Sequence, residues 1–240
     1  MKAMIFAAGA GKRLGELTRD IPKALIEING KTVLRLAVEK LTAQGFNDII
    51  VNIHHFADKV GKEIKSLRKS GYCITVSDER DNLLETGGGL FKARWFFDNN
   101  PFLLYNTDII TDMDLTSLFS FHLEKRGIAS LAVRNRPGNR FFLIDSLGII
   151  RGWRNRSTGE EIIAGGIPDG LTEIAFSGIH VVNPEIFNFM EDGIYTMTTL
   201  YLRLAAYQRI YTFRHDSGFW ADIGTLKNLD AVRKYYSEAH

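Results

Sequence analysis

Short apolar runs alternate with helical patterns over the first hundred residues, and this alternation limits the fold more than any other feature. The runs AMIFAA, DIIVNI, YCITVSD and PFLLYN have the length of buried strands. Between them, apolar residues recur at helical spacing over 33–41 and 57–67, and a third helix, entered through glycines, is expected over 87–97. Such alternation predicts a parallel sheet with helices on both faces, with ligand sites at the carboxyl ends of the strands.

The pattern changes from about residue 128 to 182. ASLAVRN, FFLIDSLGIIRGW and LTEIAFSGIHVV look like strands joined by short polar turns, without long helices between them. We expect a smaller antiparallel or mixed lobe there. Helical patterns around Met197–Leu204 and Leu226–Tyr236 then flank one more strand, IYTFRH. No repeat or linker interrupts the chain, so residues 1–240 are predicted to form a single unit that contains this lobe.

Composition excludes several classes of partner. Lys and Arg (30) exceed Asp and Glu (28) by only two, which does not argue for a nucleic-acid or anionic membrane surface. No apolar run approaches the roughly 18 residues of a membrane span, and no cleavable leader is recognisable, so we expect a cytoplasmic protein. Cys73, the one cysteine, lies in an alternating apolar stretch and is expected to be a buried thiol. The sequence pattern is compatible with a monomer and with a homodimer.

A glycine-rich loop follows the first strand. In AAGAGKRLGELTRDIPK, small residues allow backbone N–H groups to approach a phosphate, while Lys12, Arg13, Arg19 and Lys23 supply positive charge. The loop contains neither a Walker A motif nor a dinucleotide-binding fingerprint. It therefore predicts a polyphosphate site of another kind; a tight turn with solvated charges is the alternative.

Two aspartates each stand just beyond an apolar run. Asp108 follows LLYNT and Asp222 follows FWA. Magnesium prefers a few carboxylate oxygens and completes its octahedron with water and substrate phosphates, so two aspartates at converging strand ends would suit it. A capping or turn role is the alternative for each. Asp112 and Asp114 are better explained as caps of a helix beginning near Leu115.

Three consecutive glycines in LLETGGGLFKA form the third candidate motif. Glycine weakens a helix by about 1 kcal/mol relative to alanine. This cost predicts a backbone pressed closely against something flat, such as a base or a ribose. A plain loop is the alternative.

The glycine-rich loop, the two aspartates and the glycine triplet occur in the order and at the spacing found in the sugar-1-phosphate nucleotidyltransferase family. The sequence resembles this family over essentially its full length. The family pattern Ala-Ala-Gly-x-Gly-x-Arg-Leu, with Leu-Thr and Pro-Lys after it, is present at Ala7, Ala8, Gly9, Gly11, Arg13, Leu14, Leu17, Thr18, Pro22 and Lys23. LLETGGGLFKA, PFLLYNTD and FWADIGT are most similar to the bacterial N-acetylmuramate-1-phosphate uridylyltransferases. Mannose-1-phosphate guanylyltransferases are also similar.

The resemblance implies a nucleotide-diphospho-sugar transferase fold, which is a Rossmann-like, mostly parallel mixed sheet with a smaller antiparallel sugar-binding lobe. It implies Arg13, Lys23, Asp108 and Asp222 as catalytic residues, with the two aspartates holding Mg²⁺. The residues implied to bind the nucleotide are Ala8, Gly9, Gly11, Lys12, Arg13, Glu79, Glu85, Thr86, Gly87 and Gly88. Those implied to bind the sugar phosphate are Lys23, Asn106 and Gly178. The substrates would be a nucleoside triphosphate and a sugar 1-phosphate, UTP and N-acetylmuramate 1-phosphate being the expected pair.

Two departures from the family pattern keep alternatives open. Glu16 replaces a proline usually found before Leu-Thr, which is similar to bacterial choline-phosphate cytidylyltransferases. A Glu-Lys-Pro segment that many relatives use on the sugar phosphate is absent between Arg151 and Leu171, so Arg151, Arg154 or Arg156 is expected to substitute. Outside the class, a glycosyltransferase and a non-catalytic nucleotide-sugar sensor are the rivals. The first normally has an Asp-x-Asp motif, and the second would be expected to lose the Arg, Lys or Asp positions.

Overall fold

The first strand, β1 (Lys2–Phe6), runs through the parallel part of the main sheet, and its side chains alternate between two buried layers. Ala3 and Ile5 pack in one core, and Met4 and Phe6 in the other. This alternation is what a strand covered on both faces requires. The computed structural model describes residues 1–9, 11–165 and 170–238, without the side chain of Lys12.

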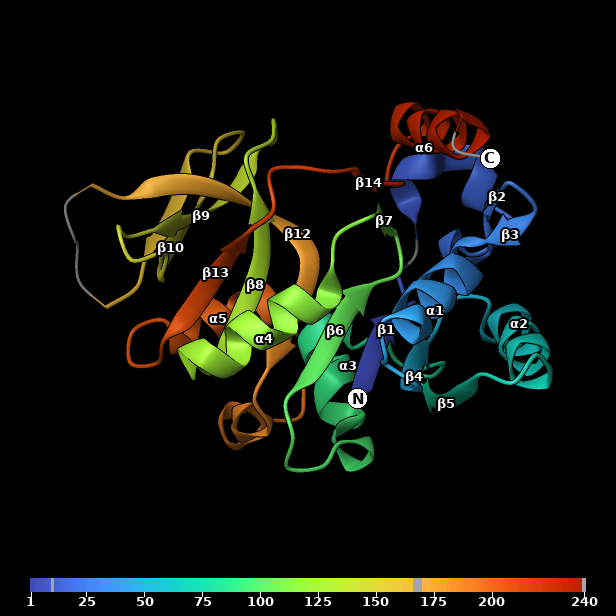
Figure 1. Ribbon diagram of the computed structural model, residues 1–240, viewed down its shortest axis with the longest axis horizontal. Helices are drawn as coiled ribbons and strands as arrows, with labels where there is room; N and C mark the ends of the chain where they lie inside the picture. Colours follow the sequence, from blue (N-terminus) through green and yellow to red (C-terminus); the bar gives the residue numbers. More distant parts are fainter. Residues whose placement is uncertain (10, 166–169, 239–240) are drawn as a thin grey trace.

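Across the described residues, a ten-stranded sheet runs through both halves of the molecule (Figure 1). In its parallel half, β1 pairs with β4 and β6, and β4 pairs with β5. These strands are β4 (Asp48–Ile53), β5 (Cys73–Asp78) and β6 (Phe102–Asn106). Figure 1 shows helices on both faces, and the two core clusters assign α1, α2 and α4 to one layer and α3 and α5 to the other. The helices are α1 (Val33–Ala43), α2 (Ala57–Lys69), α3 (Glu85–Lys92), α4 (Leu115–Lys125) and α5 (Met197–Leu204).

The antiparallel half confirms the predicted lobe. Its long strand β12 (Thr172–Val182) pairs with β6 at one end and with β9 at the other, so it joins the two halves. The other lobe strands are β8 (Ala129–Arg134), β9 (Arg140–Ile144), β10 (Ile150–Asn155), β11 (Glu160–Ile163) and β13 (Ile210–Arg214). β13 lies outside the predicted limits of the lobe, about 128–182, yet it pairs in parallel with β8.

Several short elements complete the fold. Two small sheets are formed by β2 (Glu27–Ile28) with β3 (Lys31–Thr32) and by β7 (Ile109–Thr111) with β14 (Trp220–Asp222). The 3-10 helices are η1 (Lys12–Thr18), η2 (Lys23–Leu25), η3 (Arg94–Phe96) and η4 (Pro184–Phe189). The last helix, α6 (Leu226–Glu238), lies beside β2 and β3 in Figure 1. No helix in the described ranges has the length and apolar character needed to cross a membrane.

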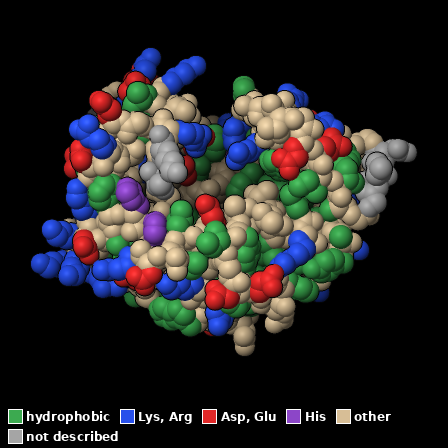
Figure 2. Space-filling model, turned by 180° about the vertical axis from the view of Figure 1, so that it is seen from behind, with side chains coloured by type: hydrophobic (Ala, Val, Ile, Leu, Met, Phe, Trp, Pro, Cys, Tyr) green, Lys and Arg blue, Asp and Glu red, His purple; other side chains and the backbone are tan. Residues whose placement is uncertain are grey.

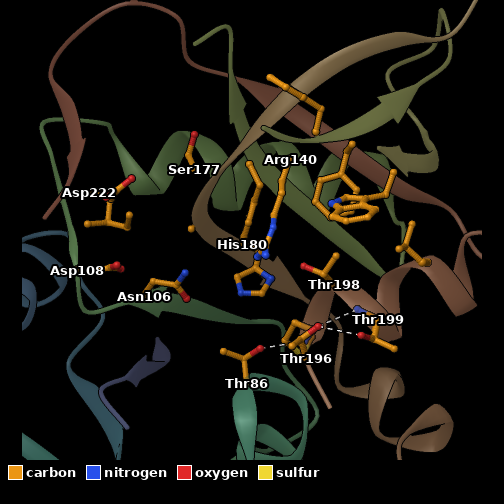
Figure 3. A pocket seen from close by; sticks show the side chains of 18 of the residues that line it. Thr86, Asn106, Asp108, Arg140, Ser177, His180, Thr196, Thr198, Thr199 and Asp222 are labelled. Carbon is orange, nitrogen blue, oxygen red and sulfur yellow. Dashed lines mark hydrogen bonds between the residues drawn. The ribbon is translucent and has the colours of Figure 1, made fainter. Parts of the chain in front are cut away.

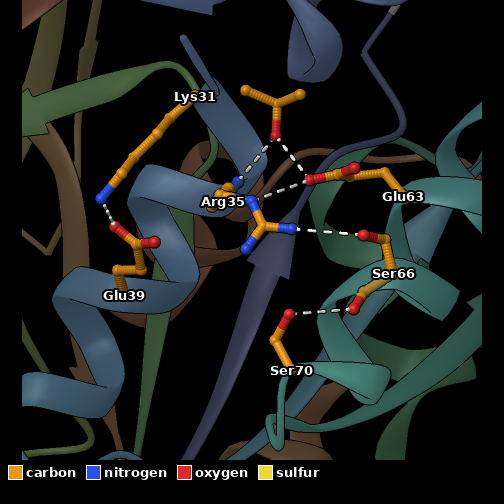
Figure 4. A network of polar contacts seen from close by, with 7 residues as sticks. Lys31, Arg35, Glu39, Glu63, Ser66 and Ser70 are labelled. Carbon is orange, nitrogen blue, oxygen red and sulfur yellow. Dashed lines mark hydrogen bonds and ion pairs between the residues drawn. The ribbon is translucent and has the colours of Figure 1, made fainter. Parts of the chain in front are cut away.

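Polar contacts hold α1 against α2 (Figure 4). Thr32 caps α1 by accepting a hydrogen bond from the Arg35 N–H, and its hydroxyl donates to Glu63 on α2 at 3.0 Å. The Arg35 guanidinium lies 3.4 Å from both Glu63 and Ser66. These contacts hold the two helices together on one face of the parallel half of the sheet.

Three details differ from the sequence-based expectations. Cys73 is exposed, because β5 is an edge strand and its thiol faces Asp48. The three glycines lie inside α3, which begins at Glu85 and ends at Lys92 instead of continuing to Phe97. Asp114 caps α4 as expected, whereas Asp112 accepts a hydrogen bond from the Phe219 N–H.

Candidate active site

Two adjoining cavities open at the carboxyl ends of the parallel strands, where the two halves of the sheet meet. The smaller, about 320 Å³, is lined by the glycine loop with Lys23, and the larger, about 550 Å³, reaches into the antiparallel lobe. Figure 2 shows the molecule hollowed between its two halves, with Lys and Arg side chains at the rim. Four residues line both cavities: Arg13, Thr86, Asn106 and Asp108. These residues form the boundary at which two ligands would meet.

A small third core holds the charged segments around this boundary. Its buried members include Leu14 beside Arg13, Ile110 near Asp108 and Ile223 after Asp222, packed with Leu229 of α6. Burying apolar side chains of this size stabilises a contact by about 1.5–3 kcal/mol each. Three segments that are distant in sequence are thus held together by packing directly behind their functional side chains.

The two aspartates come together through the pairing of β7 with β14. Asp222 lies opposite Ile109, and the Ile223 N–H donates to the Asp108 carbonyl at 3.0 Å. Asp222 Oδ1 accepts hydrogen bonds from the Gly224 N–H and the Asn228 side chain. Figure 3 shows both carboxylates on the same side of the larger cavity, near Asn106. The expected convergence of the two carboxylates is therefore observed.

Lys23 and Arg13 supply the positive charge at the same place. The Lys23 ammonium forms an ion pair with the Asp108 carboxylate, and both side chains are largely buried. Arg13 borders Gly224: a Cβ added there would lie 2.6 Å from Arg13 Nη2 and 2.7 Å from Asp222 Oδ1. The basic loop and the two aspartates thus belong to one site.

The glycine loop is shaped by its own contacts. Gly11 has a φ of 64°, which favours glycine, and a Cβ there would crowd Thr18, whose hydroxyl donates to the Gly11 carbonyl at 3.1 Å. Gly9 and Gly11 line the smaller cavity, while Ala8 between Ala7 and Gly9 is buried. The loop backbone therefore faces the space where a phosphate chain would lie.

Glu79 lies behind this loop and not on a cavity wall. Its fully buried carboxylate accepts a hydrogen bond from Asn52 at 2.8 Å, and Asn52 in turn accepts one from the Ala7 N–H. Burial raises the pKa of Glu79, and the Asn52 hydrogen bond opposes this effect. In this arrangement Glu79 supports the loop from below, in contrast to the direct nucleotide contact implied by the family resemblance.

The glycines of α3 are pressed against protein. A side chain at Gly87 would collide with Tyr195, and one at Gly88 with the Gly193 carbonyl. The N–H groups of both glycines point to the Tyr195 carbonyl, at 2.8 and 3.3 Å. The close approach predicted from the sequence is real, but its partner is the 193–195 segment and not a ligand surface. Glu85 and Thr86, at the start of the helix, do line the cavities.

The larger cavity has a floor made by β12 and β6. Gly178 has a φ of 78° and lies where the β12 register shifts, and a Cβ there would be 2.8 Å from Ile109 and 3.1 Å from Asn106. Buried His180, two residues along, is hydrogen-bonded through Nδ1 to the Tyr201 hydroxyl. Burial lowers the pKa of His180 to about 3, so its imidazole is neutral.

The three lobe arginines expected to replace the missing Glu-Lys-Pro segment do not line either cavity. Arg151 pairs with Asp145, and Arg154 and Arg156 both pair with Glu173. The alternation of β10 turns Trp153 to the cavity and its neighbour Arg154 away from it. Two other arginines, Arg136 and Arg140, do line the larger cavity.

Arg136 and Arg140 could not be identified from the sequence, because they follow a predicted strand in what looks like an ordinary turn. Arg136 donates to the Phe176 carbonyl at 3.1 Å and stacks over Trp220 at 4.7 Å. Burial lowers its pKa, and nearby Asp222 opposes this shift.

The sequence-predicted residues thus divide into two groups. The residues that line a cavity are Gly9, Gly11, Arg13, Lys23, Glu85, Thr86, Asn106, Asp108, Gly178 and Asp222. The residues that do not are Ala8, Glu79, Gly87 and Gly88. The side chain of Lys12 lies outside the described part of the structure.

Comparisons with known proteins agree with this geometry. Residues 2–238 match the Nucleotidyl transferase family. An N-acetylmuramate alpha-1-phosphate uridylyltransferase from Neisseria meningitidis is 32% identical, with 95% of each chain covered. One from Caulobacter vibrioides is 31% identical over 99% of this chain and 97% of its own.

A solved structure shares the fold. The putative glucose-1-phosphate thymidylyltransferase from Bacillus anthracis, in complex with a sucrose, superposes with a TM-score of 0.79 at 18% identity. The match covers 98% of this chain and 94% of that one. We conclude that the chain belongs to the nucleotidyl transferase family, which confirms the resemblance to the sugar-1-phosphate nucleotidyltransferases noted in its sequence.

Proposed function

We propose that the protein joins a nucleoside triphosphate to a sugar 1-phosphate, releasing pyrophosphate and leaving a nucleotide-activated sugar. One observation carries the proposal: two adjoining cavities share a wall made of Arg13, Thr86, Asn106 and Asp108, with Lys23 and Asp222 beside it. The nucleotide would occupy the cavity at the glycine loop, and the sugar the larger one. Their phosphates would then meet at the shared wall.

In the reaction, an oxygen of the sugar phosphate attacks the α-phosphorus of the triphosphate in line with the departing group. A new P–O bond forms, the bond from the α-phosphorus to the bridging oxygen breaks, and pyrophosphate leaves with the electron pair. A phosphate monoester is already ionised near neutral pH, so no general base is needed. The protein has to align two polyanions and neutralise their charge, and Arg13 and Lys23 are suited to this.

The proposal includes magnesium and the cytoplasmic location expected from the sequence. The donor set fits the ion, because Asp108 and Asp222 offer hard carboxylate oxygens beside the phosphate cavity. Asp222 uses Oδ1 for hydrogen bonds, and Oδ2 accepts none from the described residues. Magnesium held there would neutralise charge on the substrate phosphates, with those phosphates and water completing its coordination.

For the substrates we propose UTP and N-acetylmuramate 1-phosphate. Support comes from the two relatives above, which match at 31–32% identity over almost their whole length and are uridylyltransferases of that sugar phosphate. GTP with mannose 1-phosphate and CTP with phosphocholine are the alternatives within the class, and both are included in the test.

The test measures pyrophosphate release with the four nucleoside triphosphates, each combined with muramate, glucosamine, mannose and glucose 1-phosphates and with phosphocholine. We expect UTP with N-acetylmuramate 1-phosphate to give the highest kcat/KM. Asp108→Asn should reduce turnover by about 100-fold or more, whereas Asp230→Asn, on the exposed face of α6, should not.

Three outcomes would contradict the proposal. If no substrate pair released pyrophosphate, the proposed reaction would be wrong. If the Asp108→Asn enzyme were fully active, the assignment of Asp108 as a metal ligand would be wrong. Transfer of a sugar from a nucleotide sugar to an acceptor, without pyrophosphate, would identify a glycosyltransferase instead.

A further inference from the structure

On the wall of the larger cavity, Arg140 is a cation that pairs with none of the described residues. It is the first residue of β9, and its side chain is exposed to the cavity. Within residues 1–9, 11–165 and 170–238, no hydrogen bond, ion pair or ring contact engages its guanidinium. The other lobe arginine on this wall, Arg136, is held by a carbonyl and an indole ring. The two arginines therefore differ in what they can offer a ligand.

Apart from Arg136 and Glu160, the lobe residues that line the larger cavity with Arg140 are uncharged. Figure 3 shows its side chain directed toward the part of the cavity lined by His180 and Thr198, away from Asp108 and Asp222. His180 is buried and neutral, with its Nδ1 committed to Tyr201. Around it lie Thr198 and Thr199, at the N-terminal end of α5, and aromatic side chains of the lobe. This end of the cavity thus combines the charge of Arg140 with hydroxyl groups and apolar walls.

Glu160 is the carboxylate of the lobe that lines the same wall, and it does not neutralise Arg140. Both residues are in register with Asn155, Arg140 from β9 and Glu160 from β11. They are therefore two strand spacings apart, about 10 Å. Among the described residues, no ion pair joins their side chains.

A neutral ligand in this cavity would leave the charge of Arg140 unpaired. A sugar that displaced water from around the guanidinium without pairing it would incur the cost of desolvating an unpaired charge. A carboxylate would form a charge-assisted, bidentate pair with it, and the threonine hydroxyls could complete the remaining hydrogen bonds. The phosphate of the same substrate lies at the opposite end, beside Lys23 and Asp108, in the function proposed above.

We propose that Arg140 selects sugar 1-phosphates that carry an acidic substituent, by pairing with a carboxylate on the sugar. This inference rests on the proposed function and deepens it, since it names the feature of the sugar that is recognised. Arg140 would be a specificity-determining residue and would leave the phosphoryl chemistry to the residues at the shared wall.

The test uses a pair of substrates with UTP: N-acetylmuramate 1-phosphate, and N-acetylglucosamine 1-phosphate, which lacks the 3-O-lactyl group and with it the carboxylate. For the wild-type protein we expect kcat/KM to favour the acidic sugar by about 10- to 100-fold. In Arg140→Gln most of this preference should disappear, through loss with the acidic sugar and a change of less than about threefold with the neutral one. Arg140→Lys should lie between the two.

Arg209→Gln is the matched control, because Arg209 is an exposed lobe arginine that lines neither cavity. It should retain the wild-type preference. Equal use of both sugars by the wild-type protein would overturn the inference while leaving the transferase activity intact. A loss that is equal for the two sugars in Arg140→Gln would also overturn it, since Arg140 would then act on the shared phosphate. Absence of pyrophosphate release with every substrate pair would overturn the proposed function, and this inference with it.

Discussion

The ion pair between Lys23 and Asp108 gives the site a charge balance that substrates would change. Both side chains are largely buried, at 15% and 24% exposed, so neither charge is well solvated alone. In the proposed reaction Asp108 holds a metal ion and Lys23 contacts phosphate. The ammonium would therefore compete with the metal for the same carboxylate until the ammonium paired with a substrate phosphate.

This competition makes a prediction for Lys23→Ala. Without the ammonium, Asp108 should bind Mn²⁺ about tenfold more tightly in the absence of substrates, because an opposing cation has been removed. Turnover should nevertheless fall by about 100-fold, because phosphate charge is no longer neutralised. Titration of Mn²⁺ followed by electron paramagnetic resonance measures the first effect. Lys31→Ala, which removes a surface pair with Glu39, is the control; unchanged metal affinity in Lys23→Ala would contradict the competition.

His180 predicts how stability depends on pH. Burial lowers its pKa from 6.5 to about 3, so between these values the unfolded chain binds a proton that the folded protein does not. Its contribution to stability is complete above pH 6.5 and is lost as the pH falls through that window. The loss approaches 1.4 kcal/mol per pH unit.

The corresponding measurement is urea unfolding of the wild type and His180→Gln at pH 6 and pH 5. The variant should be less stable at both values, since Tyr201 loses a partner, but its loss of free energy between them should be smaller by about 1 kcal/mol. Equal losses in the two proteins would show that His180 is protonated in the folded state.

At the scale of elements, the glycines of α3 set how closely that helix approaches the 193–195 segment. Gly88→Ala should lower the free energy of unfolding by about 2–4 kcal/mol, because the added Cβ would collide with the Gly193 carbonyl. Gly61→Ala on α2 is the matched control, since a Cβ there meets nothing within 4 Å. It should stabilise the protein by about 0.5–1 kcal/mol through helix propensity. Thermal unfolding of both variants measures the two changes in stability. Similar changes for Gly88→Ala and Gly61→Ala would refute close packing at Gly88.

The long elements could be predicted from the sequence, and the shortest ones could not. DIIVNI gives β4 with its observed limits, and the spacing over 33–41 predicts α1 to within two residues. β7 and β14 have only three residues each, too few to show a period of two. Yet their pairing brings Asp108 and Asp222 together. The positions of the aspartates were predictable, whereas the element that joins them was visible only in three dimensions.

At the scale of the whole molecule, the same limit applies to contacts between distant segments. Arg13, Lys23, Asp108 and Asp222 could be selected because their motifs are local and carry a family pattern. Arg136 and Arg140 have no such motif, and they reach the cavity only because β12 joins the lobe to β6. Glu79, in contrast, has a motif that implies a role in the site, but it does not line a cavity. Its motif points to the nucleotide, but the fold buries it behind the loop.

The continuity of the main sheet argues that the molecule unfolds as one unit. β12 pairs with β6 of the parallel half and with β8 and β9 of the lobe, and β8 is completed by β13 from beyond residue 182. Unfolding the lobe alone would therefore expose the edge of β6, which pairs with β12, and would leave β13 without β8 as its partner. The cost of leaving such backbone groups unpaired couples the two halves.

Two tryptophans can test this coupling, Trp153 on β10 in the lobe and Trp220 on β14, which packs against the core under α1, α2 and α4. Variants that keep one of them, with the other tryptophans replaced by Phe, should unfold in urea at midpoints that agree with each other. In the proposed site, UTP with magnesium binds to the parallel half. If the two halves unfold as one unit, saturating UTP should therefore raise both midpoints by the same amount. Separate midpoints, or a shift seen only by Trp220, would instead reveal a lobe that unfolds independently of the sheet that carries the phosphate site.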